Sequence, residues 1–373
     1  MSTKVLKVTG DADYWNHIRA GGAALASGQI VVFPTETVYG VGVNAADPAA
    51  LDRLRRLKGR TDGKPFTVHI GSRTRVEDFV PGLQGLGRRL VDKAWPGPLT
   101  LIFHVDDPLG TGVVREHGPQ TASALYYQGD IGLRCPDDRV AADLLTEARI
   151  PVVAASANLA GGQAAVDVHE ALEALGDEVD LALDGGRSRY ARASTIVRVR
   201  SDGYDLVREG VIDPRTLRRL AQVGFLLVCA GNTCRSPMAE AMLKRLLAER
   251  LGCPGDMLAE RGYHVESAGL SAMEGAPASP EAVRVLAARG VDLSGHRSRA
   301  LTPEMLSRAD YIYVMTSGQA EAAARMSPSA AGRLRRIDDQ DIEDPIGGDE
   351  REYAACADRI EAALRRRLEE AAF

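Results

Sequence analysis

The sequence lacks long apolar runs and any strong excess of one charge. No stretch approaches the roughly 18 uncharged apolar residues that span a bilayer, and the first residues, MSTKVLKVTGDADYW, contain no apolar signal-peptide core. The 46 basic and 51 acidic residues give a formal charge of -5, which argues against a general binder of nucleic acids or membrane surfaces. We therefore expect a cytoplasmic protein with specific partners and no membrane contact.

Cysteine is also scarce. The five cysteines, at positions 135, 229, 234, 253 and 356, are spread over 373 residues, and their odd number fits reduced thiols better than a disulfide framework. At roughly 150 residues per domain, a chain of this length is expected to hold two or more domains.

Short apolar runs alternate with amphipathic segments, and this alternation predicts an α/β fold throughout. Strands are expected at 29–34, 99–105, 150–156, 224–229 and 311–316. Helices are expected at 48–60, 138–149, 238–252 and 351–371. The segment 208–224 predicts a closing strand, a turn and a short polar helix, after which a new strand begins. We therefore predict two domains, at residues 1–213 and 222–373.

One chemical motif, CAGNTCRSP at 229–237, directly follows the strand expected at 224–229. Ser236 is the expected helix N-cap, with Pro237 at the first helical position. The loop N–H groups and the helix start would converge on one point, where they stabilise an anion such as the Cys229 thiolate. Arg235 can bind two phosphate oxygens at once. A zinc site would need about four ligands, and a redox pair is more typically C-x-x-C, so a phosphate site is favoured.

Residues 222–373 resemble the low-molecular-weight protein phosphatases, through CAGNTCRSP and through SAGL at 267–270, GHRSRALT at 295–302 and DPIGG at 344–348. The resemblance implies a flavodoxin-like parallel sheet and the dephosphorylation of phosphoproteins without a metal or cofactor. It also implies that Cys229 is the nucleophile, Arg235 the phosphate clamp and Asp344 the general acid, with Asn232 and Ser236 supporting the loop and the thiolate.

The resemblance also bears on the substrate. Members of this family that are specific for phosphoarginine carry threonine at the position of Thr233, whereas phosphotyrosine enzymes typically carry a branched aliphatic residue there. DPIGG also lacks the tyrosine with which tyrosine phosphatases wall the phenol ring. Phosphoarginine is therefore favoured, with phosphotyrosine as the alternative. Arsenate reductases share the fold and the loop but need further cysteines, and none occurs between residues 254 and 355.

The first domain has no Walker loop, because GRTDGKP lacks the spacing and the hydroxyl of that motif. Three clusters mark a possible ligand site instead: PTETVYGVG at 34–42, LKGRTDGK at 57–64 and SANLAGG at 156–162. Glycines and hydroxyls beyond a strand suit close approach to a small ligand. Taken singly, however, a basic cluster at a helix end commonly complements the helix dipole, and Ser or Asn after a strand commonly forms a turn.

Together with WPGPLTLIF, IGLRCPDD, ASTIV and REGVI, these clusters resemble the Sua5/YrdC/YciO family of threonylcarbamoyl-AMP synthases, in order and spacing across residues 10–212. The resemblance implies a twisted α/β domain that joins L-threonine, bicarbonate and ATP, with Mg2+ accompanying ATP, and releases pyrophosphate. The product serves the N6-threonylcarbamoyladenosine of transfer RNA, so other tRNA-modification proteins are expected partners. The residues implied to contact ATP are Lys58, Arg60, Ser156, Asn158 and Arg208, and those implied to surround threonine are Thr35, His69, Arg134 and Ser194.

Two departures and one alternative accompany this resemblance. Thr61 stands where the family often has proline, and Arg198 stands where an acidic residue is common. The alternative is an RNA- or nucleotide-binding module without synthase activity, for which a basic face would be supplied by Arg53, Arg55, Arg56, Lys58 and Arg60. The sequence near these arginines has no aromatic run for base stacking, which disfavours that alternative.

Overall fold

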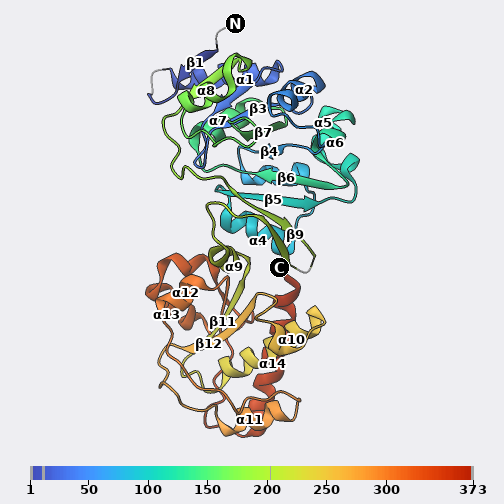
Figure 1. The fold of residues 1–373 in the computed structure, drawn as a ribbon. Helices are drawn as coiled ribbons and strands as arrows, with labels where there is room; N and C mark the ends of the chain where they lie inside the picture. Colours follow the sequence, from blue (N-terminus) through green and yellow to red (C-terminus); the bar gives the residue numbers. More distant parts are fainter. Residues whose placement is uncertain (1–2, 11–12, 202, 371–373) are drawn as a thin grey trace. The chain divides into compact units, whose positions relative to one another are not determined.

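The computed structural model describes residues 3–10, 13–201 and 203–370, and these form two compact units, Met1–Leu220 and Ala221–Phe373 (Figure 1). Residue 1 of the first predicted domain, residue 373 of the second, and the last residue of the helix expected at 351–371 lie outside the described residues. Helices and strands alternate in both units, so the predicted α/β class is confirmed.

The first unit is built on a ten-stranded mixed sheet, in the order β1-β8-β2-β3-β7-β4-β6-β5-β9-β10. The strands are β1 (Lys4–Lys7), β2 (Val31–Phe33), β3 (Gly40–Asn44), β4 (Thr67–His69), β5 (Leu99–His104), β6 (Asp130–Arg134), β7 (Val152–Ser156), β8 (Leu181–Asp184), β9 (Thr195–Val199) and β10 (Tyr204–Arg208). β4 and β6 pair in parallel, as do β5 and β9, whereas β7 runs antiparallel to both of its neighbours, β3 and β4.

Nine α-helices are described in this unit. They are α1 (Tyr14–Ala26), α2 (Pro48–Leu57), α3 (Val76–Phe79), α4 (Gly85–Ala94), α5 (Gly112–His117), α6 (Gln120–Leu125), α7 (Arg139–Glu147), α8 (Val168–Leu175) and, at the end of the unit, α9 (Pro214–Ala221). α1 and α7 pack together on one face of the sheet, where Ile18, Leu144 and Phe33 share a buried core. Gly21 permits this contact, because a Cβ at this position would lie 2.8 Å from Leu144 Cδ1.

The closing strand expected from residue 208 onward is wrong, since β10 ends at Arg208. Residues 209–213 instead bend back over β9, where the Thr195 hydroxyl replaces the strand partner. Thr195 Oγ1 accepts from the Gly210 and Ile212 N–H groups, at 3.1 and 2.9 Å, and donates to the Ile212 carbonyl at 2.7 Å. This side-chain bonding satisfies the backbone and ends the ladder.

The second unit contains a four-stranded parallel sheet in the order β12-β11-β13-β14. Its strands are β11 (Val223–Cys229), β12 (Tyr263–Gly269), β13 (Tyr311–Val314) and β14 (Leu334–Arg336), and its α-helices are α10 (Arg235–Leu251), α11 (Pro280–Ala287), α12 (Pro303–Arg308), α13 (Ser317–Met326) and α14 (Glu350–Glu370). Numbered within the unit, the strand order is 2-1-3-4, which is the flavodoxin-like order that was predicted.

Helices cover both faces of this sheet, with α10 and α14 on one side and α12 and α13 on the other (Figure 1). Alternate residues of β11 point to opposite faces. Phe225 and Leu227 enter the core with α10, α11 and α14, whereas Leu226 and Val228 enter the core with α12 and α13. Burial on both faces explains why β11 is an uninterrupted apolar run.

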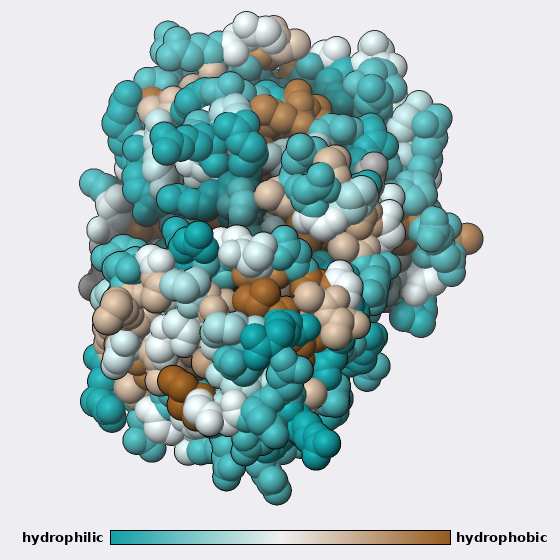
Figure 2. Space-filling view, turned by 90° about the horizontal axis from the view of Figure 1, so that it is seen from below, coloured by the Kyte–Doolittle hydropathy of each residue, from teal (hydrophilic) through white to brown (hydrophobic). Residues whose placement is uncertain are grey.

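None of the described helices is long and apolar enough to cross a membrane. Figure 2 shows one face of the molecule, on which hydrophilic side chains predominate and apolar side chains gather only in small patches.

Candidate functional sites

The first candidate site is the loop between β11 and α10. Cys229 is the last residue of β11, and α10 begins at Arg235, so five residues form the turn. Asn232 adopts a left-handed backbone conformation, with φ of 55°. Gly269, on the neighbouring strand β12, leaves room for this turn, because a Cβ there would lie 2.9 Å from the Asn232 nitrogen.

Two polar groups contact the Cys229 sulfur. The Asn232 backbone N–H donates to Sγ at 3.2 Å, and the Ser236 hydroxyl lies 2.9 Å from Sγ. The predicted supports Asn232 and Ser236 are therefore both in contact with the predicted nucleophile, although neither lines the cavity in front of it.

The prediction that Ser236 caps α10 is wrong. The helix begins two residues earlier than expected, at Arg235 rather than Pro237, and its N-cap is Cys234, whose side chain makes no capping bond. The Ser236 hydroxyl is instead engaged by Cys229 and by the Asn232 side chain, whose Nδ2 donates to it at 2.9 Å. The serine therefore serves the loop rather than the helix terminus.

Asn232 is held by a network that the sequence reasoning missed. Its Nδ2 also donates to Ser267 Oγ at 2.8 Å, and Ser267 donates to the buried Glu240 at 2.6 Å. The Arg299 backbone N–H donates to Asn232 Oδ1 at 2.9 Å, and His296 Nε2 donates to the Asn232 carbonyl at 2.8 Å. A buried glutamate on an otherwise apolar face of α10 was the signal that could have indicated such a network.

Arg235 and Asp344 complete this site. Arg235 is buried, its Nη1 donates to the Ile342 carbonyl at 2.8 Å, and its Nη2 pairs with Asp344 Oδ2. Arg235 Nε is buried and has no hydrogen-bond partner among the described residues. A cavity of about 240 Å3 brings together Cys229, Thr233, Arg235, Ser271, Asp344 and Ile346. A nucleophile, a cation and a carboxylic acid thus share one small space, as displacement at phosphorus requires.

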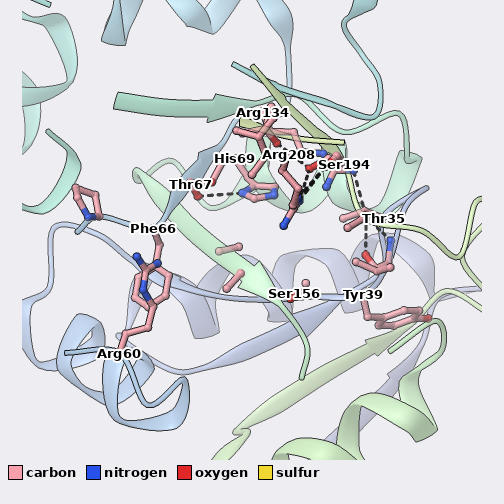
Figure 3. Close-up of a pocket in the computed structure, with 18 residues that line it drawn as sticks. Thr35, Tyr39, Arg60, Phe66, Thr67, His69, Arg134, Ser156, Ser194 and Arg208 are labelled. Atoms are coloured by element: carbon pink, nitrogen blue, oxygen red, sulfur yellow. Dashed lines mark hydrogen bonds between the residues drawn. The ribbon is translucent and has the colours of Figure 1, made fainter. Parts of the chain in front are cut away.

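The second candidate site is a cavity of about 240 Å3 in the first unit (Figure 3). Of the nine residues predicted to bind ATP or threonine, seven line it: Thr35, Arg60, His69, Arg134, Ser156, Ser194 and Arg208. Figure 3 shows His69, Arg134, Ser194 and Arg208 gathered at one side of the cavity, with Arg60 and Phe66 at the other. A guanidinium group therefore lies at each side of the cavity.

The other two predicted residues, Lys58 and Asn158, do not line the cavity but lie behind Ser156. Lys58 Nζ donates to the Ser156 carbonyl at 2.9 Å, to the Asn158 carbonyl, and to Asn158 Oδ1 at 3.2 Å. Burial, together with the nearby Arg60 charge, lowers the pKa of Lys58 to about 8. Among the described residues, the ammonium is thus held by neutral acceptors.

Arg134 lies at the end of β6 and is tied to the loop that follows β2. Its Nη2 donates to Thr37 Oγ1 at 2.6 Å, to Glu36 Oε1 at 2.9 Å and to Thr35 Oγ1 at 3.5 Å. Glu36 Oε2 and Arg134 Nε are buried without a partner among the described residues. The sequence reasoning missed Glu36 and Thr37, although both belong to the quoted PTETVYGVG segment.

His69 and Arg208 complete this side of the cavity. His69 Nδ1 donates to the Thr67 carbonyl at 3.1 Å, and burial, followed by the Arg134 charge, lowers the pKa of His69 to about 3, so the ring is neutral at physiological pH. Arg208 Nη2 donates to the Ser194 carbonyl at 2.8 Å. Burial also lowers the pKa of Arg208, with a further contribution from Arg134.

At the opposite side, the Arg60 guanidinium lies 4.7 Å from the centre of the Phe66 ring and pairs with Asp62 at 3.0 Å. Phe66 and Tyr39 both line the cavity, and neither was predicted. Among residues 3–10, 13–201 and 203–370, no three His, Cys, Asp or Glu side chains gather as a metal site would require.

Comparisons with known proteins separate the two units. Residues 23–210 match the Sua5/YciO/YrdC family model, which is described as "Telomere recombination". Residues 222–372 match the model described as "Low molecular weight phosphotyrosine protein phosphatase".

Individual relatives follow the same division. A putative threonylcarbamoyl-AMP synthase of Mycobacterium leprae (strain TN) is 37% identical over 201 residues, which cover 54% of this chain and 84% of that protein. The probable low molecular weight protein-tyrosine-phosphatase EpsP of Ralstonia solanacearum is 42% identical over 124 residues, which cover 32% of this chain and 77% of that protein. The solved structure of a variant of P. abyssi Sua5 has a TM-score of 0.51 at 20% identity, covering 90% of this chain and 98% of its own, which is a likeness of fold alone.

Proposed function

Since this chain belongs to the Sua5/YciO/YrdC family through residues 23–210 and to the low-molecular-weight phosphatase family through residues 222–372, we propose that it is a bifunctional enzyme with two independent active sites. The chain joins a threonylcarbamoyl-AMP synthase domain to a low-molecular-weight phosphatase domain. We assign the synthase to residues 1–213 and the phosphatase to residues 222–373. Both reactions use water-soluble substrates, and we propose that they take place in the cytoplasm.

The first domain makes threonylcarbamoyl-AMP from L-threonine, bicarbonate and ATP, and releases pyrophosphate. This assignment is carried by the convergence of Thr35, Arg60, His69, Arg134, Ser156, Ser194 and Arg208 on one cavity. The unpartnered Arg134 Nε is a buried donor that a carboxylate or carbamate oxygen would satisfy. His69, being neutral, can accept a hydrogen bond at Nε2 from the substrate.

The charge requirements of this reaction match the cations around the cavity. Lys58, Arg60 and Arg208 would neutralise the triphosphate, with Mg2+ bound to the ATP, while Ser156 and Asn158 hold Lys58 and the nucleotide. The carbamate oxygen attacks the α-phosphorus, and the bond to pyrophosphate breaks as its charge is stabilised by these cations. The product serves tRNA modification, and other tRNA-modification proteins are its proposed recipients.

The second domain hydrolyses phosphoproteins through a phosphocysteine. The Cys229 thiolate attacks phosphorus while Arg235 and the loop N–H groups hold the equatorial oxygens, and Asp344 protonates the leaving atom. Water then attacks the phosphocysteine, with Asp344 accepting its proton. The buried, unpartnered Arg235 Nε supports the clamp role, because a phosphate oxygen would satisfy it. The ion pair with Asp344 opens as the phosphate takes its place.

Phosphoarginine is the proposed substrate class, with phosphotyrosine as the second candidate. Thr233 and Ile346 both line the Cys229 cavity, and they contribute a hydroxyl and an aliphatic side chain. An aromatic side chain, against which the phenol ring of phosphotyrosine would pack, is not among the described residues that line this cavity. The test is the ratio of kcat/KM for a phosphoarginine peptide to that for a phosphotyrosine peptide, in the wild type and in Thr233→Ile. A strong arginine preference that reverses in the variant supports the proposal, whereas a tyrosine preference in the wild type rejects it.

The first domain has a separate test, because an RNA-binding module without synthase activity would release no pyrophosphate. Pyrophosphate release from ATP is measured with bicarbonate, in the presence and absence of L-threonine. Release that depends on threonine supports the synthase, and release that is absent or independent of threonine favours the binding module.

A further inference from the structure

A third cavity lies in the second unit, behind the phosphate loop. Its volume is about 530 Å3. It lies in the same unit as the Cys229 cavity, but no residue lines both cavities. We call it the back pocket and define it by Pro237, Ala241 and Lys244 of α10, and by Leu293, Arg297 and Arg299 of the 291–299 segment. Its size is that of a small-molecule site.

The back pocket is lined by both apolar and cationic side chains. Pro237, Ala241 and Leu293, together with Val291, form the apolar part. Four cations (Lys244, Arg245, Arg297, Arg299) line the pocket against two carboxylates (Glu240, Asp292). The first two cations already form ion pairs, since Lys244 pairs with Glu240 at 2.5 Å and Arg245 pairs with Glu361 at 2.8 Å.

Arg297 and Arg299 have donors to spare. Arg297 donates only to the carbonyls of His296 and Ser294, at 2.7 and 3.4 Å, and pairs with no carboxylate among the described residues. Arg299 approaches Glu266 at 3.6 Å and shares that carboxylate with Arg308. Two guanidinium groups two residues apart, with few counter-charges, suit a phosphate group, which accepts several charge-assisted hydrogen bonds.

The lining of the back pocket also holds Asn232. The His296 ring and the Arg299 backbone N–H donate to Asn232 at 2.8 and 2.9 Å, and Glu240 accepts from Ser267, which bonds the Asn232 side chain. Asn232 in turn donates its backbone N–H to the Cys229 sulfur. One residue therefore separates the back pocket from the nucleophile.

We propose that the back pocket binds a small phosphorylated molecule with an apolar body, and that its occupancy lowers phosphatase turnover. The phosphate sits between Arg297 and Arg299, and the apolar body covers Pro237, Ala241 and Leu293. Drawing the 291–299 segment toward the bound phosphate moves the His296 and Arg299 donors that hold Asn232 in its left-handed conformation. The donor that Asn232 presents to Cys229 is displaced with it, and kcat falls.

Phenylphosphonate is a suitable probe, because it carries an apolar ring and a phosphonate that the enzyme cannot hydrolyse. Calorimetric titration of the full chain is expected to show two sites. Arg235→Ala removes the site in front of Cys229, whereas the double variant Arg297→Ala/Arg299→Ala weakens the other roughly tenfold or more. Arg325→Ala, which removes an exposed arginine of α13 far in sequence from the pocket, is the matched control and leaves both sites unchanged. If the double variant does not fold, the same titration is carried out with Arg297→Gln alone, which breaks no ion pair among the described residues.

Turnover of p-nitrophenyl phosphate provides the second readout. In the wild type, phenylphosphonate is expected to lower kcat as well as raise KM, whereas in the double variant it only competes with substrate. A single site that vanishes in Arg235→Ala and persists in the double variant would overturn the proposal, as would purely competitive inhibition of the wild type. Binding of a glutamate-rich peptide in place of phenylphosphonate would assign the pocket to an acidic protein segment instead. The titration does not depend on turnover, so a failed phosphatase assay and a missing back-pocket site are distinguishable.

Discussion

The two candidate active sites differ in how the chain builds them. The Cys229 site draws its proposed nucleophile, its loop donors and its cation from the eight residues 229–236, whereas Ser271, Asp344 and Ile346 come from distant segments. The cavity of the first unit draws on residues from Thr35 to Arg208, which lie at or near the ends of several strands and, for Arg60, between α2 and β4. A contiguous loop fixes its geometry locally, whereas a dispersed site depends on the register of a ten-stranded sheet. A single substitution is therefore expected to lower activity more strongly in the loop than in the cavity of the first unit.

The largest effect is expected for Arg235→Lys. A lysine cannot reproduce the two-pronged geometry at the phosphate, so phosphatase kcat/KM should fall roughly 10³-fold. Steady-state kinetics with a phosphopeptide check this, and threonine-dependent pyrophosphate release should be unchanged. Arg325→Lys serves as control. Activity within about threefold of the wild type would mean that Arg235 does not hold the phosphate.

A smaller loss is expected for Arg208→Met in the dispersed site. Other cations remain around the cavity, so the KM for ATP should rise roughly 10- to 100-fold rather than activity being abolished. Arg200→Met is the matched control, because Arg200 follows the partner strand β9, pairs with Asp205 at 2.5 Å and does not line the cavity. If the KM for ATP changes equally in both variants, Arg208 does not bind the nucleotide.

The pH dependence of ATP binding tests Lys58. Burial holds its pKa at about 8, below the ordinary value for lysine, so the charged form is present below pH 8 and lost as pH rises above it. The KM for ATP should therefore increase by up to about tenfold per pH unit above 8. Lys58→Arg keeps its charge and should flatten this dependence. A wild-type KM that stays constant between pH 7 and 10 would contradict the role of the ammonium.

The smallest expected effect concerns the stability of the first unit. Thr195→Val removes the hydroxyl that bonds Gly210 and Ile212, which should lower the free energy of unfolding by about 1–3 kcal/mol. Trp15 and Trp95 are the only tryptophans and both belong to the first unit, so urea unfolding followed by tryptophan fluorescence reports on that unit. The exposed Thr74→Val should change it by less than about 0.5 kcal/mol. If the two variants change the free energy of unfolding equally, the Thr195 hydroxyl does not determine the conformation of residues 209–213.

The same contrast explains what the sequence could predict. Strands such as β11 and β13 were found because both of their faces are buried and their residues are apolar throughout. The residues around Cys229 could be named because their spacing along the chain already defines a turn. Ser236 was misassigned as a cap because its sequence position fits a helix start, whereas its hydroxyl bonds Cys229 and Asn232 across the turn.

Contacts between distant segments were not accessible in this way. Glu36, Thr37 and Tyr39 stand beside predicted residues, but their roles depend on Arg134 and Gly186, which are about a hundred or more residues away in sequence. Glu240, Ser267 and His296 likewise come from distant segments: Ser267 donates to Glu240, and both Ser267 and His296 contact Asn232. Local patterns give the type of element and the chemistry of a contiguous motif, whereas register and tertiary packing decide which polar groups become partners.

The central claim, that one chain carries two independent active sites, is tested most directly by measuring both activities in Cys229→Ser and in Lys58→Ala. Threonine-dependent pyrophosphate release and phosphopeptide hydrolysis are assayed on the same preparations, with circular dichroism to establish that each variant is folded. The account predicts that Cys229→Ser abolishes hydrolysis and spares pyrophosphate release, and that Lys58→Ala does the reverse. Loss of both activities in either folded variant would contradict it.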